Sequence, residues 1–338
     1  MIAQESVANK PQLLPRWVQI ALAFSAVYVI WGSTYLAIKF AIDGLPPFLM
    51  AGTRFLIAGT LVFSWVSRSG KERPTWTHWR SAAIVGGLLL VGGNGGVVYA
   101  EKTVPTGLCS LLVSVVPIWV ALIEWLRPGG APPKIPVIFG LALGLGGVAL
   151  LIGTDKLGGG NINLLGAATV LGASFCWSAG SLYSRHAELP KAPLLATAME
   201  MLTGGAMMLL ISFALGEPGR LDLAHVSAKT FWAVGYLIIF GSIVGFSAYI
   251  WLLNNVDASR VATYAYVNPL VAVFLGWAFA GESISARTMM AAAIILAAVA
   301  IITRYQGRTK VEHDEEIECE TPGPAVGAQV PHQTHTKS

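Results

Sequence analysis

Charged residues are scarce in this chain of 338 residues, since Asp, Glu, Lys and Arg together make up only 12% of it. A typical soluble domain carries about 25% charged residues, so this chain has too few to cover a water-facing surface. Cysteine is scarce too: Cys109, Cys176 and Cys319 are scattered, with no CxxC spacing. That pattern excludes a disulfide framework and a cysteine zinc site. The chain is therefore neither a soluble monomer nor a small disulfide-stapled domain.

Motifs of enzymes and nucleotide-binding proteins are also missing. The sequence has no P-loop, no HExxH and no GxSxG, and His78, His186 and His225 lie in separate loops. We therefore expect no ATP site, no metal cluster and no cofactor. The net charge of +4 comes from loop lysines and arginines. Because no basic face with interleaved aromatics is present, nucleic acid is not an expected partner.

Long apolar runs are what the chain does contain, with 54% hydrophobic residues and 37 glycines. A helix rising 1.5 Å per residue needs about 20 residues to cross a hydrocarbon core about 30 Å thick. Ten runs meet this requirement: 17–38, 46–66, 79–100, 105–126, 135–152, 164–184, 194–215, 231–253, 258–280 and 286–303. The predicted fold class is all-α, a polytopic membrane protein with ten transmembrane helices.

Loop charges predict the orientation of these spans. With the amino terminus inside, fourteen lysines and arginines fall on the inner side and six on the outer side, namely Lys39, Lys102, Lys156, Arg220, Lys229 and Arg287. Cytoplasmic loops carry the excess of Lys and Arg, so both termini, including residues 1–16, are predicted to be cytoplasmic. Residues 305–338 are acidic and then rich in Pro, Gly and Thr, and we expect them to form a disordered cytoplasmic tail.

The two halves of the chain resemble each other. At a spacing of 146 the matches are Trp31 with Trp177, Pro47 with Pro193 and Gly59 with Gly205, and at 152 they are Pro117 with Pro269 and Trp125 with Trp277. These matches predict a first repeat over 17–152, a connecting loop over 153–163 and a second repeat over 164–304. Five spans is an odd number, so the second repeat would be inverted, as in many transporters. Chance recurrence of Pro, Trp and Gly is the alternative.

Two charges lie deep in the predicted spans at equivalent repeat positions, Arg54 and Glu200. A charge in hydrocarbon costs at least about 2.5 kcal/mol, so each needs a reason to be there. One hypothesis makes Glu200 a proton or cation coupling site that Arg54 modulates; the other makes them a structural ion pair or two snorkelling side chains. Glu124 lies close to Arg127 at the predicted inner surface, where snorkelling explains it.

A substrate pathway is predicted from polar and aromatic residues in the spans. Asn94 lies among four glycines that weaken the helix, and irregular backbone survives at membrane depth only against protein or a water-filled cavity. Pro117 and Pro269 are candidate hinges because proline removes a helical hydrogen bond. The predicted pathway residues are Trp31, Ser33, Tyr35, Asn94, Tyr99, Ser174, Trp177, Ser178, Ser181, Tyr264, Tyr266 and Asn268. Interhelical hydrogen bonding, an interfacial aromatic belt and ordinary helix curvature remain the alternatives.

Five motifs in order carry a family resemblance: Trp31-Gly32-Ser33-Thr34-Tyr35, Ala51-Gly52-Thr53-Arg54-Phe55, Gly93-Asn94-Gly95, Ala265-Tyr266-Val267-Asn268-Pro269 and Gly281-Glu282. From about Val18 to Arg304 the chain resembles the EamA-type permeases of the drug/metabolite transporter superfamily, and most of all their YedA-like inner-membrane branch. The resemblance implies two five-helix repeats around a central cavity in the bacterial inner membrane. It also implies efflux or exchange of small metabolites. The chain departs from the family at Gly129-Gly130, where a glycine-glutamate is usual.

The sequence thus predicts a secondary-active transporter, not an enzyme, that exports or exchanges amino acids, aromatic or amphiphilic compounds or drugs by alternating access. A facilitative uniporter or importer is the alternative, and a membrane-embedded enzyme acting on lipid or a sensor with an acidic tail is a more distant one. The expected partners are a small-molecule substrate and the lipid bilayer, with protons as a candidate coupling ion. Substrate identity, transport direction and oligomeric state stay open.

Overall fold

The computed structural model describes residues 14–68, 72–128, 132–152, 163–222, 224, 226–256, 261 and 264–320, and these residues are helical with no strand among them. In the first half the helices are α1 (Arg16–Ala26), η1 (Val27–Trp31), α2 (Gly32–Ile42), α3 (Pro47–Ser67), α4 (Trp76–Gly86), η2 (Gly87–Gly95), α5 (Gly96–Ala100), α6 (Thr106–Val113), α7 (Val116–Leu126) and α8 (Ile135–Ile152). In the second half they are α9 (Leu164–Ser184), α10 (Pro193–Ala214), η4 (Pro218–Arg220), α11 (Ala228–Tyr236), η6 (Leu237–Val244), α12 (Gly245–Asn255), α14 (Tyr264–Ala280) and α15 (Ala286–Glu320).

Several of these elements join end to end into membrane-length helices. Seven helices of the described chain are long and apolar enough to cross a membrane: Arg16–Ile42, Pro47–Ser67, Trp76–Ala100, Thr106–Leu126, Leu164–Ser184, Pro193–Ala214 and Ala228–Leu252. Three shorter apolar helices lie within the other three predicted spans: Ile135–Leu150, Val267–Ala280 and Ala286–Ile302. The all-helical membrane fold is therefore confirmed, while the count of ten spans stays a prediction.

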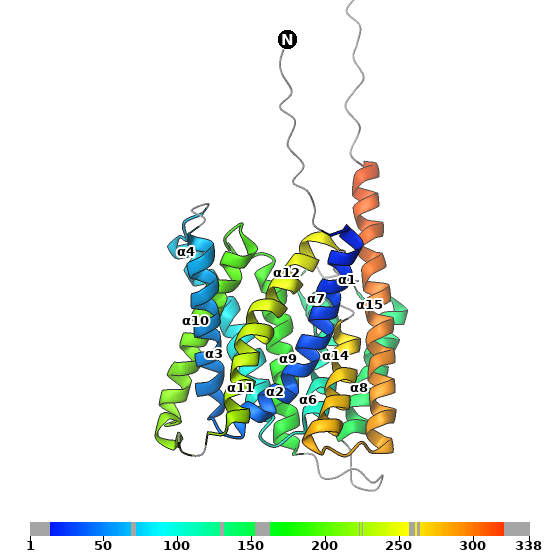
Figure 1. Ribbon diagram of the computed structural model, residues 1–338. Helices are drawn as coiled ribbons and strands as arrows, with labels where there is room; N and C mark the ends of the chain where they lie inside the picture. Colours follow the sequence, from blue (N-terminus) through cyan, green and yellow to red (C-terminus); the bar gives the residue numbers. More distant parts are fainter. Residues whose placement is uncertain are drawn as a thin grey trace, which may run out of the picture.

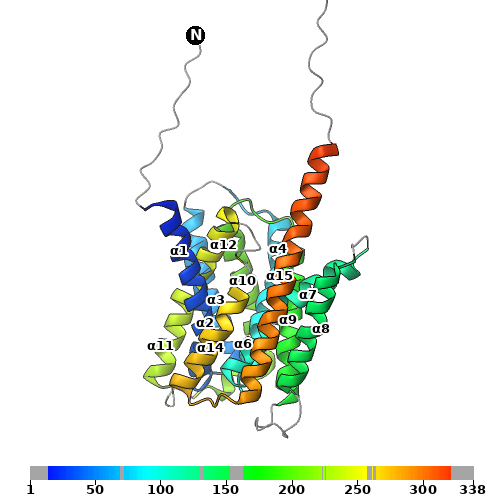
Figure 2. The same ribbon diagram turned by 90° about the vertical axis from the view of Figure 1, so that its right-hand side faces the viewer.

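The helices pack side by side into one bundle, as Figures 1 and 2 show. Helix α1 begins, and α15 ends, at the same end of this bundle, which we call the terminal end (Figure 1). At the opposite end, the distal end, α2 finishes and α11 begins. A chain that starts and finishes at one end crosses the bundle an even number of times.

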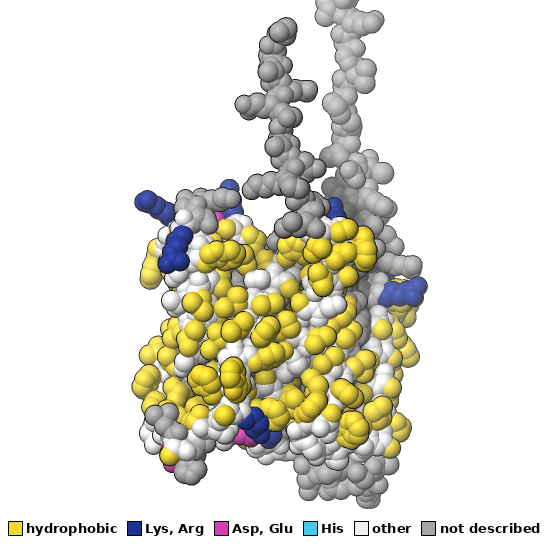
Figure 3. Space-filling view, in the orientation of Figure 1, with side chains coloured by type: hydrophobic (Ala, Val, Ile, Leu, Met, Phe, Trp, Pro, Cys, Tyr) yellow, Lys and Arg dark blue, Asp and Glu magenta, His cyan; other side chains and the backbone are white. Residues whose placement is uncertain are grey.

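The sides of the bundle are apolar. Figure 3 shows hydrophobic side chains over the flank of the molecule, with Lys and Arg gathered toward its two ends. Trp17, Trp76 and Trp232 are each at least 72% exposed and lie near helix ends, as expected for residues at a membrane interface. Trp79 packs against Phe63, with ring centroids 5.8 Å apart. The distribution is that of a protein surrounded by lipid.

Small residues set the closest helix contacts. A Cβ on Gly205 of α10 would lie 2.9 Å from the backbone nitrogen of Leu56 and 3.1 Å from the carbonyl oxygen of Gly52, both on α3. A Cβ on Gly59 of α3 would lie 3.0 Å from the backbone nitrogen of Leu202 on α10. Backbones approach this closely only where side chains are missing. Helices α3 and α10, one from each half of the chain, are therefore joined backbone to backbone.

The acidic segment after residue 304 differs from its prediction. It was expected to be disordered from residue 305, but α15 continues as a helix to Glu320 and projects beyond the bundle (Figure 1). Residues 305–320 consist largely of Lys, Arg, Glu and Gln, which favour helix once a preceding helix supplies the nucleus. Residues 321–338 lie outside the described part of the chain.

Reciprocal carboxylate caps relate the two halves. Glu217, which follows α10, accepts hydrogen bonds from the backbone N–H groups of Phe48 (3.4 Å) and Leu49 (2.8 Å) at the start of α3. Glu72, which follows α3, accepts them from Lys191 and Ala192 (3.1 Å each), just before α10. Each helix is thus capped by the acid that follows the other. This reciprocity is what an inverted pair of repeats predicts.

The Glu72 cap makes stability depend on pH. Hydrogen bonds from the backbone of Ala192 and Lys191 hold the pKa of Glu72 below its ordinary value. A lowered folded-state pKa contributes stability above the unfolded pKa of about 4.3, and this contribution disappears as the pH falls through the folded value. We expect Glu72→Gln to reduce the melting temperature at pH 7 and to narrow the difference between pH 7 and pH 3. Fluorescence-detected size exclusion after heating measures both, with the exposed Glu188→Gln as control. Equal pH dependence in wild type and Glu72→Gln would contradict the cap.

Candidate functional site: a cavity between the two halves

A cavity of about 110 Å³ lies inside the bundle. A cavity of this size holds several water molecules or a small molecule, since one water needs about 10–15 Å³ by the same measure. From the first half it is lined by Trp31, Thr34, Tyr35, Ile38, Arg54, Gly93, Asn94, Val97, Ser110, Val113, Ser114 and Val116. From the second half the lining residues are Ala173, Ser174, Trp177, Gly241, Phe246, Tyr264, Ala265, Asn268 and Pro269. Helices α8, α10 and α15 contribute none of these residues.

Irregular helix geometry surrounds the cavity. The segments η1, η2 and η6 are π-helical, and η2 and η6 occupy equivalent places in the two halves. Such wider turns occur mostly at functional sites. Gly93, in η2, gives room to the ring of Trp177, because a Cβ there would lie 3.0 Å from the Trp177 Cε3 atom. The glycine-rich segment around Asn94 thus remains helical but with a wider turn, and it brings the backbone to the cavity wall.

The two proline hinges differ in the structure. Helix α6 ends at Val113 and α7 begins at Val116, so the fourth span is interrupted at residues 114 and 115, shortly before Pro117. Pro269 lies inside the continuous helix α14 and lines the cavity. Only the first of the two matching prolines therefore accompanies a break in its helix. Ser114, which lies in this break, lines the cavity.

Three polar atoms at the cavity are buried without a hydrogen-bond partner: Nη1 of Arg54 and the amide oxygens of Asn94 and Asn268. Arg54 is only 2% exposed, and its Nε donates to Oγ of Ser242 at 2.8 Å. Neither of the two salt bridges resolved between described residues involves Arg54. Buried polar groups are normally satisfied, so such orphans at a cavity need an explanation. The cavity thus presents one unpaired cation and two unpaired acceptors.

Aromatic side chains gather around Trp31 at the wall of the cavity. The Trp31 ring lies 5.3 Å from Phe246, 5.0 Å from Tyr249 and 5.4 Å from Tyr264, measured between centroids. Beyond them, Val27, Leu252 and Val261 form a buried cluster. The pairs with Phe246 and Tyr264 are edge-to-face, and pairs of that geometry are each worth about 0.5–1.5 kcal/mol beyond burial. They are weak enough individually to rearrange.

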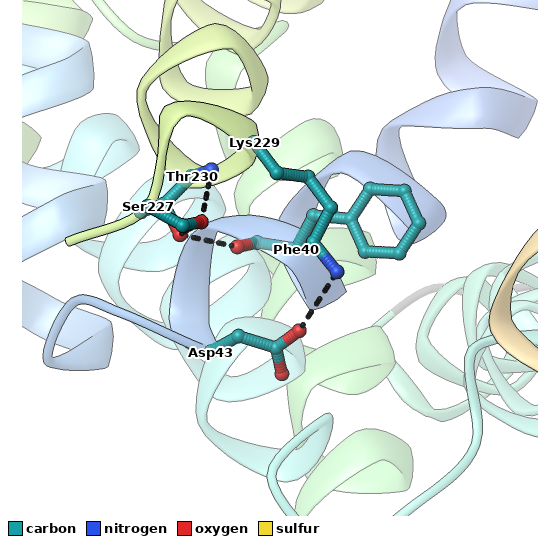
Figure 4. A network of polar contacts seen from close by, with 5 residues as sticks. All are labelled: Phe40, Asp43, Ser227, Lys229 and Thr230. Carbon is teal, nitrogen blue, oxygen red and sulfur yellow. Dashed lines mark hydrogen bonds and ion pairs between the residues drawn. The ribbon is translucent and has the colours of Figure 1, made fainter. Parts of the chain in front are cut away.

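Polar contacts join the helices at the distal end. Figure 4 shows Nζ of Lys229 at 3.6 Å from Oδ2 of Asp43, and Oγ1 of Thr230 donating to the carbonyl of Phe40 at 3.2 Å. These contacts tie the end of α2 to the start of α11. Ser227 caps α11 by accepting the N–H of Thr230 at 3.2 Å. Polar contacts therefore join the two halves of the chain at the distal end.

Seven of the twelve predicted pathway residues line the cavity: Trp31, Tyr35, Asn94, Ser174, Trp177, Tyr264 and Asn268. Four do not. Ser33 contacts the Tyr236 hydroxyl at 2.7 Å, Tyr99 is 46% exposed, and Ser178 and Ser181 donate to helix carbonyls one turn back. The side chain of Tyr266 lies outside the described residues, as do Gly129 and Gly130.

Arg54 and Glu200, for which an ion pair was one hypothesis, lie in different environments. Arg54 lines the cavity and bonds to Ser242, whereas Glu200 is half-buried on α10 and is not among the lining residues. The structure forms no ion pair between these two described residues. Glu124, for which snorkelling was predicted, is 39% exposed at its side chain and forms a salt bridge with Arg185 at 3.8 Å. The coupling role of Glu200 stays a prediction.

Sequence reasoning missed Ser110, Ser114 and Phe246 as lining residues, and it missed buried Glu101. Ser110 and Ser114 are four residues apart in the fourth span, before Pro117. Two serines spaced by about one helical turn ahead of a proline were therefore the signal available in the sequence. Glu101 next to Lys102 resembles an ordinary charged loop pair, and nothing in the sequence distinguishes it.

The site is thus a partly polar, aromatic-walled cavity in a membrane-spanning helix bundle, with residues from both halves of the chain. Among the described residues, no group of His, Cys, Asp and Glu could hold a metal ion. Comparison with known proteins agrees with this class. The family model for the "EamA-like transporter family" matches residues 18–153 and again 164–304. The chain belongs to the EamA-like transporter family.

Individual relatives are transporters by name. The chain is 38% identical to "Uncharacterized inner membrane transporter YedA" of Escherichia coli (strain K12), over 86% of this chain and 92% of that protein. It is 25% identical to "Uncharacterized transporter YoaV" of Bacillus subtilis (strain 168), over 87% and 100%. A solved crystal structure shares the fold, with a TM-score of 0.59 and 21% identity over 85% of this chain and 97% of that chain. The resemblance noted in the sequence is confirmed.

Proposed function

We propose that this protein is a secondary-active transporter that exports or exchanges small metabolites by alternating access through the central cavity. The carrying observation is the cavity itself, which both halves of the chain line. Aromatic contacts of Trp31 with Tyr249 and Tyr264, and polar contacts between α2 and α11, join the same two halves. Alternate opening requires contacts of this kind between the halves to break and form. Facilitated movement without a driving ion, in either direction, is the second candidate, and it would use the same cavity.

The proposal includes two inverted five-helix repeats in a bacterial inner membrane, with both termini cytoplasmic. Two matches to one family model, the reciprocal caps of Glu72 and Glu217, and the shared end of α1 and α15 support it. The excess of Lys and Arg in the loops at the terminal end supports a cytoplasmic location for that end.

The polar atoms of the cavity favour a particular substrate chemistry. An unpaired guanidinium at Arg54 attracts a carboxylate, and the free amide oxygens of Asn94 and Asn268 accept hydrogen bonds from N–H or O–H groups. Trp31, Trp177 and Tyr264 provide apolar faces beside them. An amphiphilic molecule that combines a carboxylate, hydrogen-bond donors and an apolar side chain fits this set, as an aromatic amino acid does.

Transport by purified protein in liposomes tests the proposal with three probes that differ in charge. We expect phenylalanine, a zwitterion, and benzoate, an anion, to exchange across the membrane, and tetraphenylphosphonium, a cation, to be excluded by Arg54. Protein-free liposomes give the background for each probe. Preferred movement of tetraphenylphosphonium would contradict the assigned substrate chemistry, and movement of none of the three would contradict this proposal of function.

A further inference from the structure

Glu101 is a buried acid that the transport cavity does not itself use. It is the first residue after α5, and its side chain is 0% exposed. Neither carboxylate oxygen has a hydrogen-bond partner in the structure. Burial of an ion without a partner costs much more than burial of the neutral acid. Glu101 is therefore protonated as long as it stays buried.

Glu282 beside it has the opposite environment. Its Oε1 accepts the N–H of Thr106 at 2.6 Å and the Thr106 hydroxyl at 2.8 Å, and its Oε2 accepts the N–H of Gly107 at 3.1 Å. Gly281 makes this possible, because its φ of 68° turns the chain back at the end of α14. Three donors at the amino end of α6 stabilise the carboxylate form. Glu282 therefore caps the start of α6 with both carboxylate oxygens.

Other titratable groups around Glu101 come from two more helices. The charged groups in electrostatic contact with it are Glu282 and Lys39 of α2, and Tyr35 and Cys109 face it as neutral groups. Burial raises the pKa of Glu101 most and the charge of Glu282 raises it further, while Lys39 lowers it. Among the resolved contacts, Lys39 forms no salt bridge with Glu101. No ion pair with Lys39 therefore compensates a charge on the Glu101 carboxylate.

Glu101 lies directly beyond the distal end of the cavity. Its backbone N–H donates to the carbonyl of Val97 at 3.0 Å, so it is one helical turn past a lining residue. Tyr35 both lines the cavity and faces Glu101, and Ser110 lines it one turn after Thr106, the residue that Glu282 holds. Four residues of helix rise about 6 Å. A small movement of α5 or α6 would therefore expose Glu101 to the cavity or to the distal face.

We infer that Glu101 is the proton-binding site of the transport cycle, accepting a proton from water at one opening of the cavity and releasing it to water at the other, while Glu282 stays bonded to the start of α6. Only a proton moves, between the Glu101 carboxylate and water, and no other bond changes. The coupling of this proton to a substrate rests on the proposed function, whereas the proton site itself does not.

Infrared spectroscopy of purified protein in detergent tests the site without any substrate. We expect a protonated-carboxyl band that persists at neutral pH and disappears as the pH is raised, and we expect Glu101→Gln to abolish it. Glu217→Gln serves as control. Glu217 is buried like Glu101, but its carboxylate accepts two backbone N–H groups. Glu282→Gln removes the neighbouring negative charge and should shift the titration of the band to lower pH.

Each outcome decides the inference. Absence of the band in wild type, its survival in Glu101→Gln, or its loss in Glu200→Gln instead would overturn it. In liposomes, accumulation of phenylalanine driven by a pH gradient should fall at least tenfold in Glu101→Gln, relative to exchange at equal pH. If wild type transports none of the probes, the proposed function fails, while the infrared result still judges the proton site. Unchanged gradient-driven accumulation in a folded Glu101→Gln would overturn the coupling.

Discussion

Replacing Arg54 with glutamine is expected to reduce the transport of carboxylate-bearing probes by at least about 30-fold. Removing one partner of a buried, hydrogen-bonded charge pair costs about 2–5 kcal/mol, and 1.36 kcal/mol corresponds to a factor of ten. Arg54 is 2% exposed and its Nη1 has no partner in the structure, so a bound carboxylate would be its main counter-charge. Initial rates of phenylalanine and benzoate exchange in liposomes measure the loss.

The same variant separates a substrate-binding role from a structural one. An unpaired buried cation destabilises a folded protein, so Arg54→Gln should melt at a temperature equal to or above that of wild type when no substrate is present. Arg54→Lys keeps the charge but not the planar fork and should fall between the two in rate. Lys102→Gln removes an exposed cation outside the cavity lining and should change neither property. A large fall in melting temperature with unchanged exchange would assign Arg54 to structure.

The order of the helices and about half of the pathway could be predicted from the sequence. Both depend on the free-energy cost of placing each residue in lipid, which can be judged residue by residue. Apolar length identifies a membrane helix, and a polar residue such as Asn94 or a lone charge such as Arg54 is expensive in lipid unless it faces a cavity. Those arguments place a residue at a depth in the membrane. Asn94 and Arg54 both line the cavity, as their cost in lipid suggested.

Rotation about the helix axis is what depth arguments do not provide. Arg54 and Glu200 lie at similar predicted depths, yet Arg54 faces Ser242 of η6 and Glu200 lies on a helix that contributes no lining residue. Ser174 lines the cavity, whereas Ser178, one turn later on α9, donates to helix carbonyls. Which turn of a helix meets the cavity depends on tilt and on π-helical turns, and these arise from packing between distant segments. Glu101 and Lys102 are adjacent charged residues, and the sequence does not show that the first side chain is buried and the second exposed.

Replacing Gly205 with alanine is expected to destabilise the protein by about 1–3 kcal/mol, the usual cost of overpacking a core. A Cβ at this position would meet backbone atoms of Leu56 and Gly52, and backbone moves less readily than a side chain. Helices α3 and α10 would have to separate along the contact between the two halves. Thermal unfolding followed by size exclusion measures the effect.

Gly146 on α8 gives the matched control because a Cβ there meets nothing within 4 Å. Alanine is favoured over glycine inside a helix by about 0.8–1.0 kcal/mol, so Gly146→Ala should raise the melting temperature while Gly205→Ala lowers it. The same Gly→Ala change would then shift the melting temperature in opposite directions at the two sites. This separates the effect of close helix contact from that of helix propensity. Stabilisation in both variants would mean that α3 and α10 have room between them, and the direct backbone contact between the halves would then be wrong.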